Sequence, residues 1–288
     1  MIQQKFGDKP LSVMLFTTSD GQSPRMDDLD RLFGSVASFV NSTSGINLRH
    51  FLLMQRTSAE QMKALVMRFP EFVTIHAIDN RVSLSKARNM LLSAKTCREG
   101  LAAAHVVAFP DDDCWYPAGT LGRVVSAFSQ NADVDFWFCR YGSEPLSPGA
   151  HSETEPSLQT VIGRASSNTI FFRGTLVNKV GGFDETLGVG AKINGGEDTD
   201  YALRSYYLAR KVLFLNVRAI GHRDIDPKLK TRYFAGSMVA IWRHAWNSPA
   251  GLWAAARKAL VGVALALLGR MSAMDLLKAF RLSVGSRT

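Results

Sequence analysis

The chain has 288 residues, of which 46% are hydrophobic, 20% charged and 10% aromatic. This ordinary globular composition excludes disordered, collagen-like and coiled-coil proteins. Three widely spaced cysteines without a Cys-X-X-Cys pair exclude a disulfide framework and a zinc ribbon, and they favour a reducing, cytosolic setting. The net charge is +9, and because no basic segment followed by a long apolar stretch opens the sequence, we expect no signal peptide.

Strand-like and helix-like segments alternate over the first 110 residues. Short apolar runs predict strands at Leu11–Thr17, Leu48–Met54, Phe72–Ile78 and Ala103–Phe109. Apolar residues at helical spacing predict helices at Asp28–Val40, Ala59–Arg68 and Ser85–Ala94. This alternation is typical of an α/β protein with an open, mostly parallel sheet and helices on both faces.

The second half continues this mixture and then changes character. We expect helices at Leu121–Ser129 and Thr199–Ala209, strands at Val134–Arg140, Ile170–Phe172 and Val212–Leu215, and a proline-containing loop at Ser143–Pro156. Beyond about residue 230 only helix is predicted. The sequence therefore predicts an α/β domain of residues 1–230 and a helical segment of residues 231–288.

Three carboxylates, those of Asp111, Asp112 and Asp113, follow the fourth predicted strand. Open α/β sheets bind ligands at the carboxyl ends of their strands, where Asp111 and Asp113 can converge on one divalent cation that also binds diphosphate oxygens. His222 follows a late strand, and two carboxylates with an imidazole suit Mn²⁺. The alternatives are an acidic surface turn and a structural histidine.

A second acidic motif, Gly-Gly-Glu-Asp-Thr-Asp at 195–200, precedes a predicted helix. Asp198 or Glu197 can act there as the general base that takes a proton from an acceptor hydroxyl. Alternatively, Thr199 caps the helix and the acidic residues only suit its N-terminus. The glycine-rich stretch Leu187–Gly196 predicts a mobile lid, and Arg88, near a helix start, can hold a phosphate or a base edge.

Basic residues are concentrated in the last third of the chain, where residues 201–288 contain 15 Lys and Arg against 3 Asp and Glu. The stretch Leu252–Leu282 is rich in Leu, Ala and Met, and its longest uncharged run, Ala259–Gly269, is shorter than a spanning helix needs. With Trp242, Trp246 and Trp253 nearby, we expect one or two helices on an anionic membrane surface. The alternative is packing against the rest of the chain. Nucleic acid is disfavoured, because no recognised binding motif accompanies the charge.

The order of these motifs, over about residues 11–245, resembles the inverting family 2 glycosyltransferases of the GT-A fold, in particular the bacterial polysaccharide-biosynthesis type. SLSKARN at 83–89 is similar to the family's G-X-S-X-A-R-N segment, and FPDDDCWYP at 109–117 to its DXD metal motif. VGGFDETLGVGA at 180–191 and GGEDTDYALR at 195–204 are similar to its acceptor block and its ED base motif.

The resemblance implies roles for individual residues. Asp111 and Asp113, with His222, would hold Mn²⁺ or Mg²⁺ on the donor diphosphate, and Asp198 would be the catalytic base with Glu197 beside it. The remaining assignments are Thr17, Gln55, Arg88 and Asp112 to the nucleotide-sugar, and Trp115, Phe183 and Asp184 to the sugar or acceptor pocket. The chain departs from the family at Gln55, near which an Asp that binds the base is usual, and at Ser83, where Gly is usual.

The resemblance implies metal-dependent, inverting transfer from a nucleotide-sugar, expected to be UDP-linked, to a saccharide acceptor. The basic, apolar C-terminal third favours a lipid-linked acceptor at the inner face of the plasma membrane, as in cell-surface polysaccharide biosynthesis. Two other functions stay open. One is a non-catalytic sugar-nucleotide-binding scaffold subunit. The other is a metal-dependent nucleotidyltransferase, although the Gly-rich basic loop expected after its first strand is only faintly matched by TTSDGQSPR.

Overall fold

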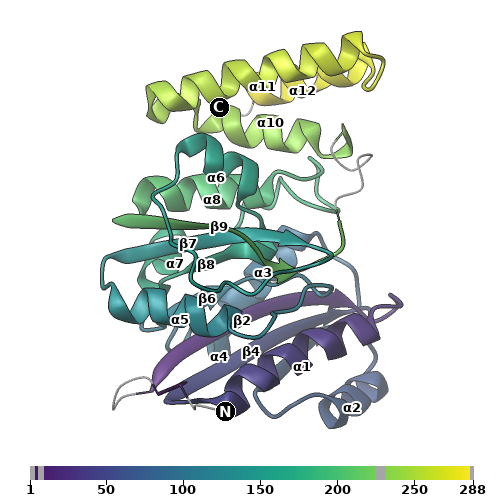
Figure 1. The fold of residues 1–288 in the computed structure, drawn as a ribbon. Coiled ribbons are helices and arrows are strands. Elements are labelled where there is room, and N and C mark those ends of the chain that lie inside the picture. Colours follow the sequence, from purple (N-terminus) through teal and green to yellow (C-terminus); the bar gives the residue numbers. More distant parts are fainter. Residues whose placement is uncertain (1–3, 6–9, 225–230, 286–288) are drawn as a thin grey trace.

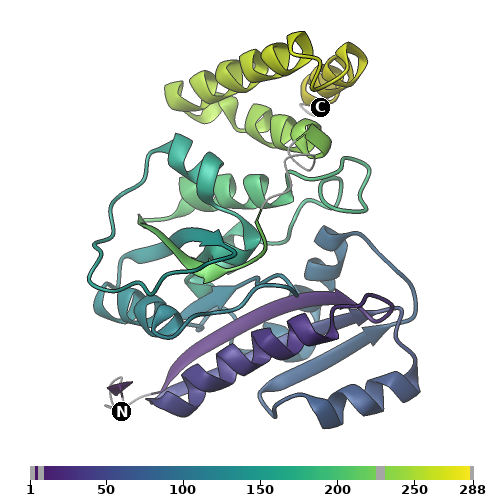
Figure 2. The same cartoon turned by 45° about the vertical axis from the view of Figure 1, so that its right-hand side comes forward.

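The computed structural model describes residues 4–5, 10–224 and 231–285. Figures 1 and 2 show an α/β body with a layer of C-terminal helices stacked at one end of it. The predicted domain boundary at residues 230/231 falls at the end of segment 225–230, which lies outside the described residues.

A seven-stranded sheet forms the centre of the body, in the order β5-β4-β2-β6-β8-β7-β9. Its strands are β2 (Leu11–Asp20), β4 (Ile46–Gln55), β5 (Val73–Ile78), β6 (Val106–Ala108), β7 (Val134–Gly142), β8 (Ile170–Phe172) and β9 (Lys211–Gly221). Only β8 runs antiparallel to its neighbours in this sheet. The short strands β1 (Gln4–Lys5) and β3 (Thr43–Ser44) pair in parallel beside it. The predicted open, mostly parallel sheet is therefore confirmed.

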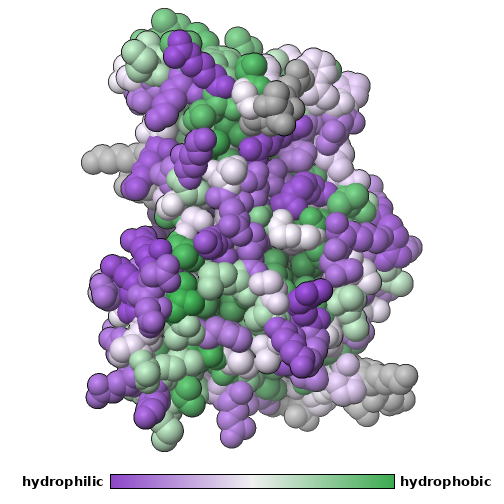
Figure 3. Space-filling model, turned by 180° about the vertical axis from the view of Figure 1, so that it is seen from behind, coloured by the Kyte–Doolittle hydropathy of each residue, from purple (hydrophilic) through white to green (hydrophobic). Residues whose placement is uncertain are grey.

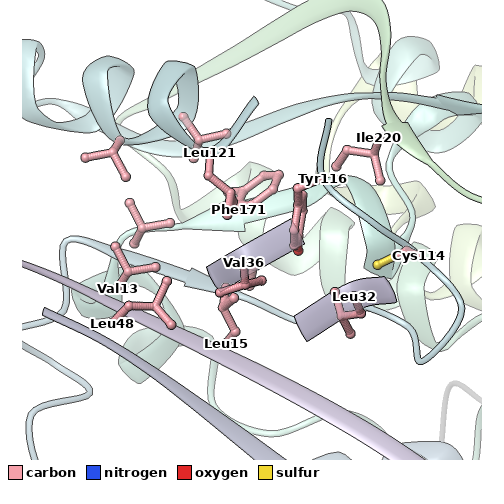
Figure 4. Close-up of a cluster of buried hydrophobic side chains, with 14 of the residues drawn as sticks. Val13, Leu15, Leu32, Val36, Leu48, Cys114, Tyr116, Leu121, Phe171 and Ile220 are labelled. Carbon is pink, nitrogen blue, oxygen red and sulfur yellow. The ribbon is translucent and has the colours of Figure 1, made fainter. Parts of the chain in front are cut away.

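Helices cover both faces of the sheet, as predicted. On one face lie α1 (Met26–Ser42), α2 (Ala59–Arg68) and α5 (Thr120–Gln130); on the other lie α3 (Leu84–Ser93), α4 (Lys95–Arg98), α6 (Leu158–Arg164), α7 (Gly174–Val180) and α8 (Glu197–Leu208). In β2, Val13 and Leu15 join the first core, shown in Figure 4, while Met14 and Phe16 join the second. Because side chains alternate along a strand and both faces are covered, this strand is a continuous apolar run in the sequence.

Several predicted boundaries differ from the observed ones. Strand β6 is shorter than predicted, and β2 and β9 extend farther toward the edge at which the parallel strands end. The expectation that Thr199 caps α8 is wrong. The helix begins two residues earlier, because Gly196 takes the left-handed conformation (φ 88°) and serves as the N-cap.

The C-terminal layer consists of α10 (Phe234–Arg243), α11 (Pro249–Leu267) and α12 (Ala273–Gly285). Helix α10 packs on α8 of the body, and α11 and α12 pack on α10 (Figures 1 and 2). A Cβ at Gly236 would lie 2.1 Å from the carbonyl oxygen of Gly195, so the two backbones touch there. His244 Nε2 lies 2.9 Å from Asp200 Oδ1, which joins the other end of α10 to α8.

Within the described residues, α11 alone is long and apolar enough to cross a membrane by length and composition. A stretch of 18 residues in this helix has a mean hydropathy of 1.5, and 22% of the stretch is buried inside the protein. Figure 3 shows apolar side chains mixed with hydrophilic ones at this end of the molecule. The three cysteines, Cys97, Cys114 and Cys139, are all free and buried.

Candidate active site

A cleft of about 1280 Å³ lies at the edge of the sheet where the parallel strands end. Strand β2 ends there at Asp20 and β4 at Gln55, while Asp111 follows β6 and His222 follows β9. Parallel strands bring their carboxyl ends to one edge, so residues far apart in the sequence meet there. The opposite wall comes from the start of α8 and from the C-terminal layer.

Three predicted metal ligands converge in this cleft. Asp111, Asp113 and His222 each offer one ligand atom, and these atoms lie within 4.8 Å of one another. His222 Nε2 is 3.1 Å from Asp113 Oδ1, and its Nδ1 is 2.7 Å from the carbonyl oxygen of Arg223. If Nδ1 donates to that carbonyl, Nε2 is left for the carboxylates: when protonated it donates to Asp113, and when deprotonated its lone pair would be free for a metal ion. Two carboxylates and an imidazole are a donor set that fits Mn²⁺ or Mg²⁺.

The charges around Asp113 keep it ionised. Against the effect of burial, the hydrogen bond from His222 and the positive charges of Arg25 and Arg223 lower the pKa of Asp113 to about 2. Its Oδ2 lies 3.0 Å from a nitrogen of each guanidinium, but neither is oriented to donate a hydrogen bond to it. Among the described residues, this buried oxygen therefore has charge partners but no hydrogen-bond donor.

Asp112 lines the cleft but already has partners. Ser19 Oγ donates to its Oδ2 at 2.6 Å, and Arg25 donates to its Oδ1 at 2.7 Å. The carboxylate thus joins the end of β2 and the start of α1 to the loop after β6.

Arg88 connects the metal-ligand candidates with the predicted base. Its side chain is only 2% exposed, and it donates to Asp198 Oδ1 at 2.9 Å and to Asp111 Oδ1 at 3.1 Å. Ser167 makes a parallel link, from its amide to Asp198 Oδ2 at 2.9 Å and from its hydroxyl to Asp111 Oδ1 at 3.0 Å. Arg88 lies in the cleft as predicted, and in this structure its bonds go to carboxylates.

The two acidic residues at the start of α8 have different environments. Asp198 faces the cleft and accepts hydrogen bonds from Arg88 and from the amide of Ser167. Glu197 is buried, and burial together with the charge of Asp198 raises the pKa of Glu197 to about 7. The two neighbouring carboxyl groups therefore differ in exposure and in hydrogen bonding.

Gln55 and a residue that the sequence analysis did not select lie at the other end of the cleft. Gln55 Oε1 accepts a hydrogen bond from the amide of Val82 at 2.7 Å. Asp20, at the end of β2, accepts from Arg56 Nε at 2.9 Å and lies 3.8 Å from Arg81 Nε. The signal for Asp20 was its position directly after an apolar strand.

Four predicted site residues do not line the cleft, namely Thr17, Trp115, Phe183 and Asp184. Thr17 is buried behind the wall and bonds His50 at 2.8 Å and the carbonyl oxygen of Pro110 at 3.0 Å. Trp115 packs under the guanidinium of Arg31, 3.9 Å from the ring centroid. These two side chains support the loop around Asp111–Asp113 from behind.

Phe183 and Asp184 also support neighbouring elements. The Phe183 ring stacks on Tyr201 at 4.1 Å and lies 5.0 Å from the Arg88 guanidinium. Asp184 forms an ion pair with Arg243 of α10. The predicted lid, Leu187–Gly196, is bonded to the start of α3, where the Ser85 hydroxyl donates to the Leu187 carbonyl at 2.6 Å.

Neither a protein-family model nor a curated protein sequence matches this chain. Among solved structures, Staphylococcus aureus TarS 1-349 superposes with a TM-score of 0.55 at 16% identity, over 80% of this chain and 65% of that one. The same fragment in complex with UDP-GlcNAc has a TM-score of 0.54 at 16% identity, over 81% of this chain and 66% of that one. Its complex with UDP has a TM-score of 0.53 at 17% identity, over 81% of this chain and 65% of that one. This chain thus spans slightly less than two thirds of the first neighbour. The likeness shows the fold, and the predicted GT-A architecture is confirmed.

Proposed function

We propose that this protein is a metal-dependent, inverting glycosyltransferase of the family 2 type, with a UDP-linked sugar as donor. The observation that carries the proposal is the convergence of Asp111, Asp113 and His222 with Asp198 in one cleft at the carboxyl edge of the sheet. The shared fold with TarS supports it, because TarS structures contain UDP-GlcNAc and UDP.

The geometry assigns a separate task to each group. Asp111, Asp113 and His222 would hold Mn²⁺ or Mg²⁺, which supplies Lewis-acid stabilisation of the leaving diphosphate. Asp198 takes the proton from the acceptor hydroxyl while the acceptor oxygen attacks the anomeric carbon opposite the leaving UDP. Arg88 and Ser167 each bond both carboxylates and so hold Asp198 in place relative to Asp111. A single displacement converts an α-linked donor into a β-linked product.

We also propose that the acceptor is a lipid-linked saccharide of cell-surface polysaccharide biosynthesis, and that the chain works on the inner face of the plasma membrane. Trp253, Leu260 and Leu267 of α11 recur every seven residues, so they lie on one helix face, and all three are more than half exposed. The basic residues of the C-terminal third favour an anionic surface.

The proposal is tested by thermal unfolding of the wild type and of Asp113→Ala with UDP, other nucleoside diphosphates and UDP-sugars, with Mn²⁺ or with EDTA. A ligand that binds only the native state raises the melting temperature. We expect UDP to stabilise the wild type only with Mn²⁺ and to leave the variant unchanged. If no diphosphate raised the melting temperature in the presence of Mn²⁺, the proposed donor site would be refuted.

Activity assays separate the rival functions. Release of UDP from a UDP-sugar supports a transferase over a non-catalytic binding subunit. Release of diphosphate from a nucleoside triphosphate would instead indicate a nucleotidyltransferase.

A further inference from the structure

The C-terminal layer forms part of the cleft that contains the candidate active site. Lys258, Val261 and Leu265 of α11 and Arg270 after it line the same cleft as Asp198. Its volume of about 1280 Å³ exceeds the roughly 300–1,000 Å³ of ordinary small-molecule sites. The cleft is therefore large enough for two substrates, with the carboxylates of the sheet edge at one side and the C-terminal layer at the other.

The charges on the two sides are arranged differently. On the sheet side, Asp20 and the run Asp111–Asp113 lie among Arg81, Arg88 and Arg223, which pair with them, whereas the α11 side contributes the cations Lys258 and Arg270. A smaller adjoining pocket of about 520 Å³ shares Thr231, Phe234 and Arg270 with the cleft. Further basic residues line this pocket: Lys192, Arg232 and Lys278.

Within the described part of the chain, these basic groups have no carboxylate partner. Lys258, Arg270, Lys192, Arg232 and Lys278 appear in none of its ion pairs, although most arginines of the α/β body are paired. The acidic side chain in the smaller pocket, Asp275, accepts a hydrogen bond from Ser272 Oγ at 2.7 Å. Unpaired cations around a concave surface are suited to an anionic ligand.

Lys258 is the most enclosed of these cations. Its Nζ lies 4.3 Å from the centroid of the Phe234 ring, which the close approach of α11 at Gly262 places beneath it. Burial, together with the charge of Arg257, lowers the pKa of Lys258 to about 8. Burying an ammonium group without a carboxylate has a free-energy cost, and an anion bound beside it offsets that cost.

We propose that Lys258 and Arg270 form a subsite for a phosphate or diphosphate group of the acceptor. The inference rests on the proposed glycosyltransferase function, and it names the acceptor class as a phosphate-bearing saccharide. Val261 and Leu265 lie beside the two cations in the cleft wall, so a hydrocarbon chain attached to the phosphate has apolar surface to contact. The sugar of such an acceptor extends toward Asp198.

The test is calorimetric titration of the full chain in EDTA, with inorganic pyrophosphate and with farnesyl diphosphate as probes. EDTA removes any divalent cation that would hold a diphosphate at Asp111 and Asp113, so binding through a metal ion does not contribute. We expect Lys258→Met and Arg270→Gln each to weaken binding by about tenfold or more, since each removes a charge-assisted hydrogen bond. Lys63→Met, on exposed α2, is the matched control and should bind like the wild type.

The outcomes are distinguishable. Tighter binding of farnesyl diphosphate than of pyrophosphate supports a lipid-linked acceptor, and equal binding supports a water-soluble phosphate-bearing one. Unchanged affinity in both variants, with melting temperatures like that of the wild type, overturns the subsite. UDP titration of the wild type with Mn²⁺ tests the donor site separately, so a failed glycosyltransferase assignment is not confused with a failed subsite.

Discussion

Arg88 and Asp198 are joined by a 2.9 Å hydrogen bond, although 110 positions separate them in the sequence. The same guanidinium also bonds Asp111. The proposed base and a proposed metal ligand are therefore held by one rigid, planar group. The spacing between the two carboxylates therefore depends on this arginine.

Replacing Asp198 with Asn tests the proposed base. The amide cannot accept a proton, so we expect the turnover number to fall by roughly 10²–10⁴-fold. UDP affinity in Mn²⁺ should stay near the wild-type value, because the three ligand candidates are retained. Asp133→Asn, at an exposed and remote site, is the control. Turnover above one tenth of the wild-type rate would show that another group takes the proton.

Arg88→Lys keeps the positive charge but loses the planar fork. One ammonium cannot hold Asp111 and Asp198 at their observed spacing, so we expect turnover to fall about 10²-fold through misplacement of the base. Arg123→Lys alters a comparable forked pair with Glu153 away from the cleft, and it should leave turnover unchanged. Equal rates for both variants would contradict a positioning role for Arg88.

Gly236→Ala tests the contact between α10 and the loop before α8. The new methyl group would meet the Gly195 carbonyl, so we expect a loss of about 1–3 kcal/mol in the free energy of unfolding. Gly34 lies on the exposed face of α1 with nothing within 4 Å of an added Cβ, so Gly34→Ala should stabilise by roughly 0.5–1 kcal/mol. Urea denaturation measures both. Stabilisation by Gly236→Ala would mean that the two backbones can separate without cost.

The buried carboxyl of Glu197 predicts a specific pH dependence of stability. Burial raises its pKa from 4.5 to about 7, so between these values the native state binds the proton more tightly than the unfolded chain does. Stability therefore falls as the pH rises through this window. Glu197→Gln removes this loss, so its stability relative to the wild type should increase from pH 4.5 to 8 by on the order of 1–3 kcal/mol. Urea denaturation at several pH values in EDTA measures it, and a pH-independent difference would refute the prediction.

Leu260→Asp and Leu267→Asp test the proposed membrane face. These side chains are 64% and 83% exposed, so the substitutions should leave the fold intact. Burying a leucine contributes about 1.5–3 kcal/mol, so we expect each change to lower co-sedimentation with phosphatidylglycerol vesicles about tenfold. Met67→Asp, 88% exposed on α2 at the far end of the molecule, is the control. If co-sedimentation fell equally in all three variants, the loss would come from the added negative charge in general and not from the proposed membrane face.

The local elements could be predicted from the sequence because their signals are short-range. Helix α2 has its predicted bounds, and Ser58 and Gln61 form the capping box that starts it. Strand β6 ends at Ala108, and Pro110, which has no N–H to donate to the sheet, precedes the run Asp111–Asp113. Strand ends of a parallel sheet share one edge, so the aspartates after β6 and His222 after β9 lie at the same edge.

Side-chain direction was harder to predict. Thr17 and Trp115 lie close to cleft residues in the sequence, but their side chains contact His50 and Arg31 instead of lining the cleft. Arg25 and Ser167 contact the acidic residues from distant segments. Their hydrogen bonds depend on how α1 and the loop before β8 pack, and no spacing in the sequence records that packing.

The three buried thiols can be used to measure where the structure opens. Burial raises the pKa of Cys97, Cys114 and Cys139, so a disulfide reagent reacts with them only when water reaches the sulfur. Cys114 directly follows Asp113, whereas Cys139 lies in the middle of β7. The modification rate of Cys114 thus measures loosening of the acidic loop, and that of Cys139 measures unfolding of the sheet. A nucleotide that protects only the first thiol would identify its binding site without any assay of catalysis.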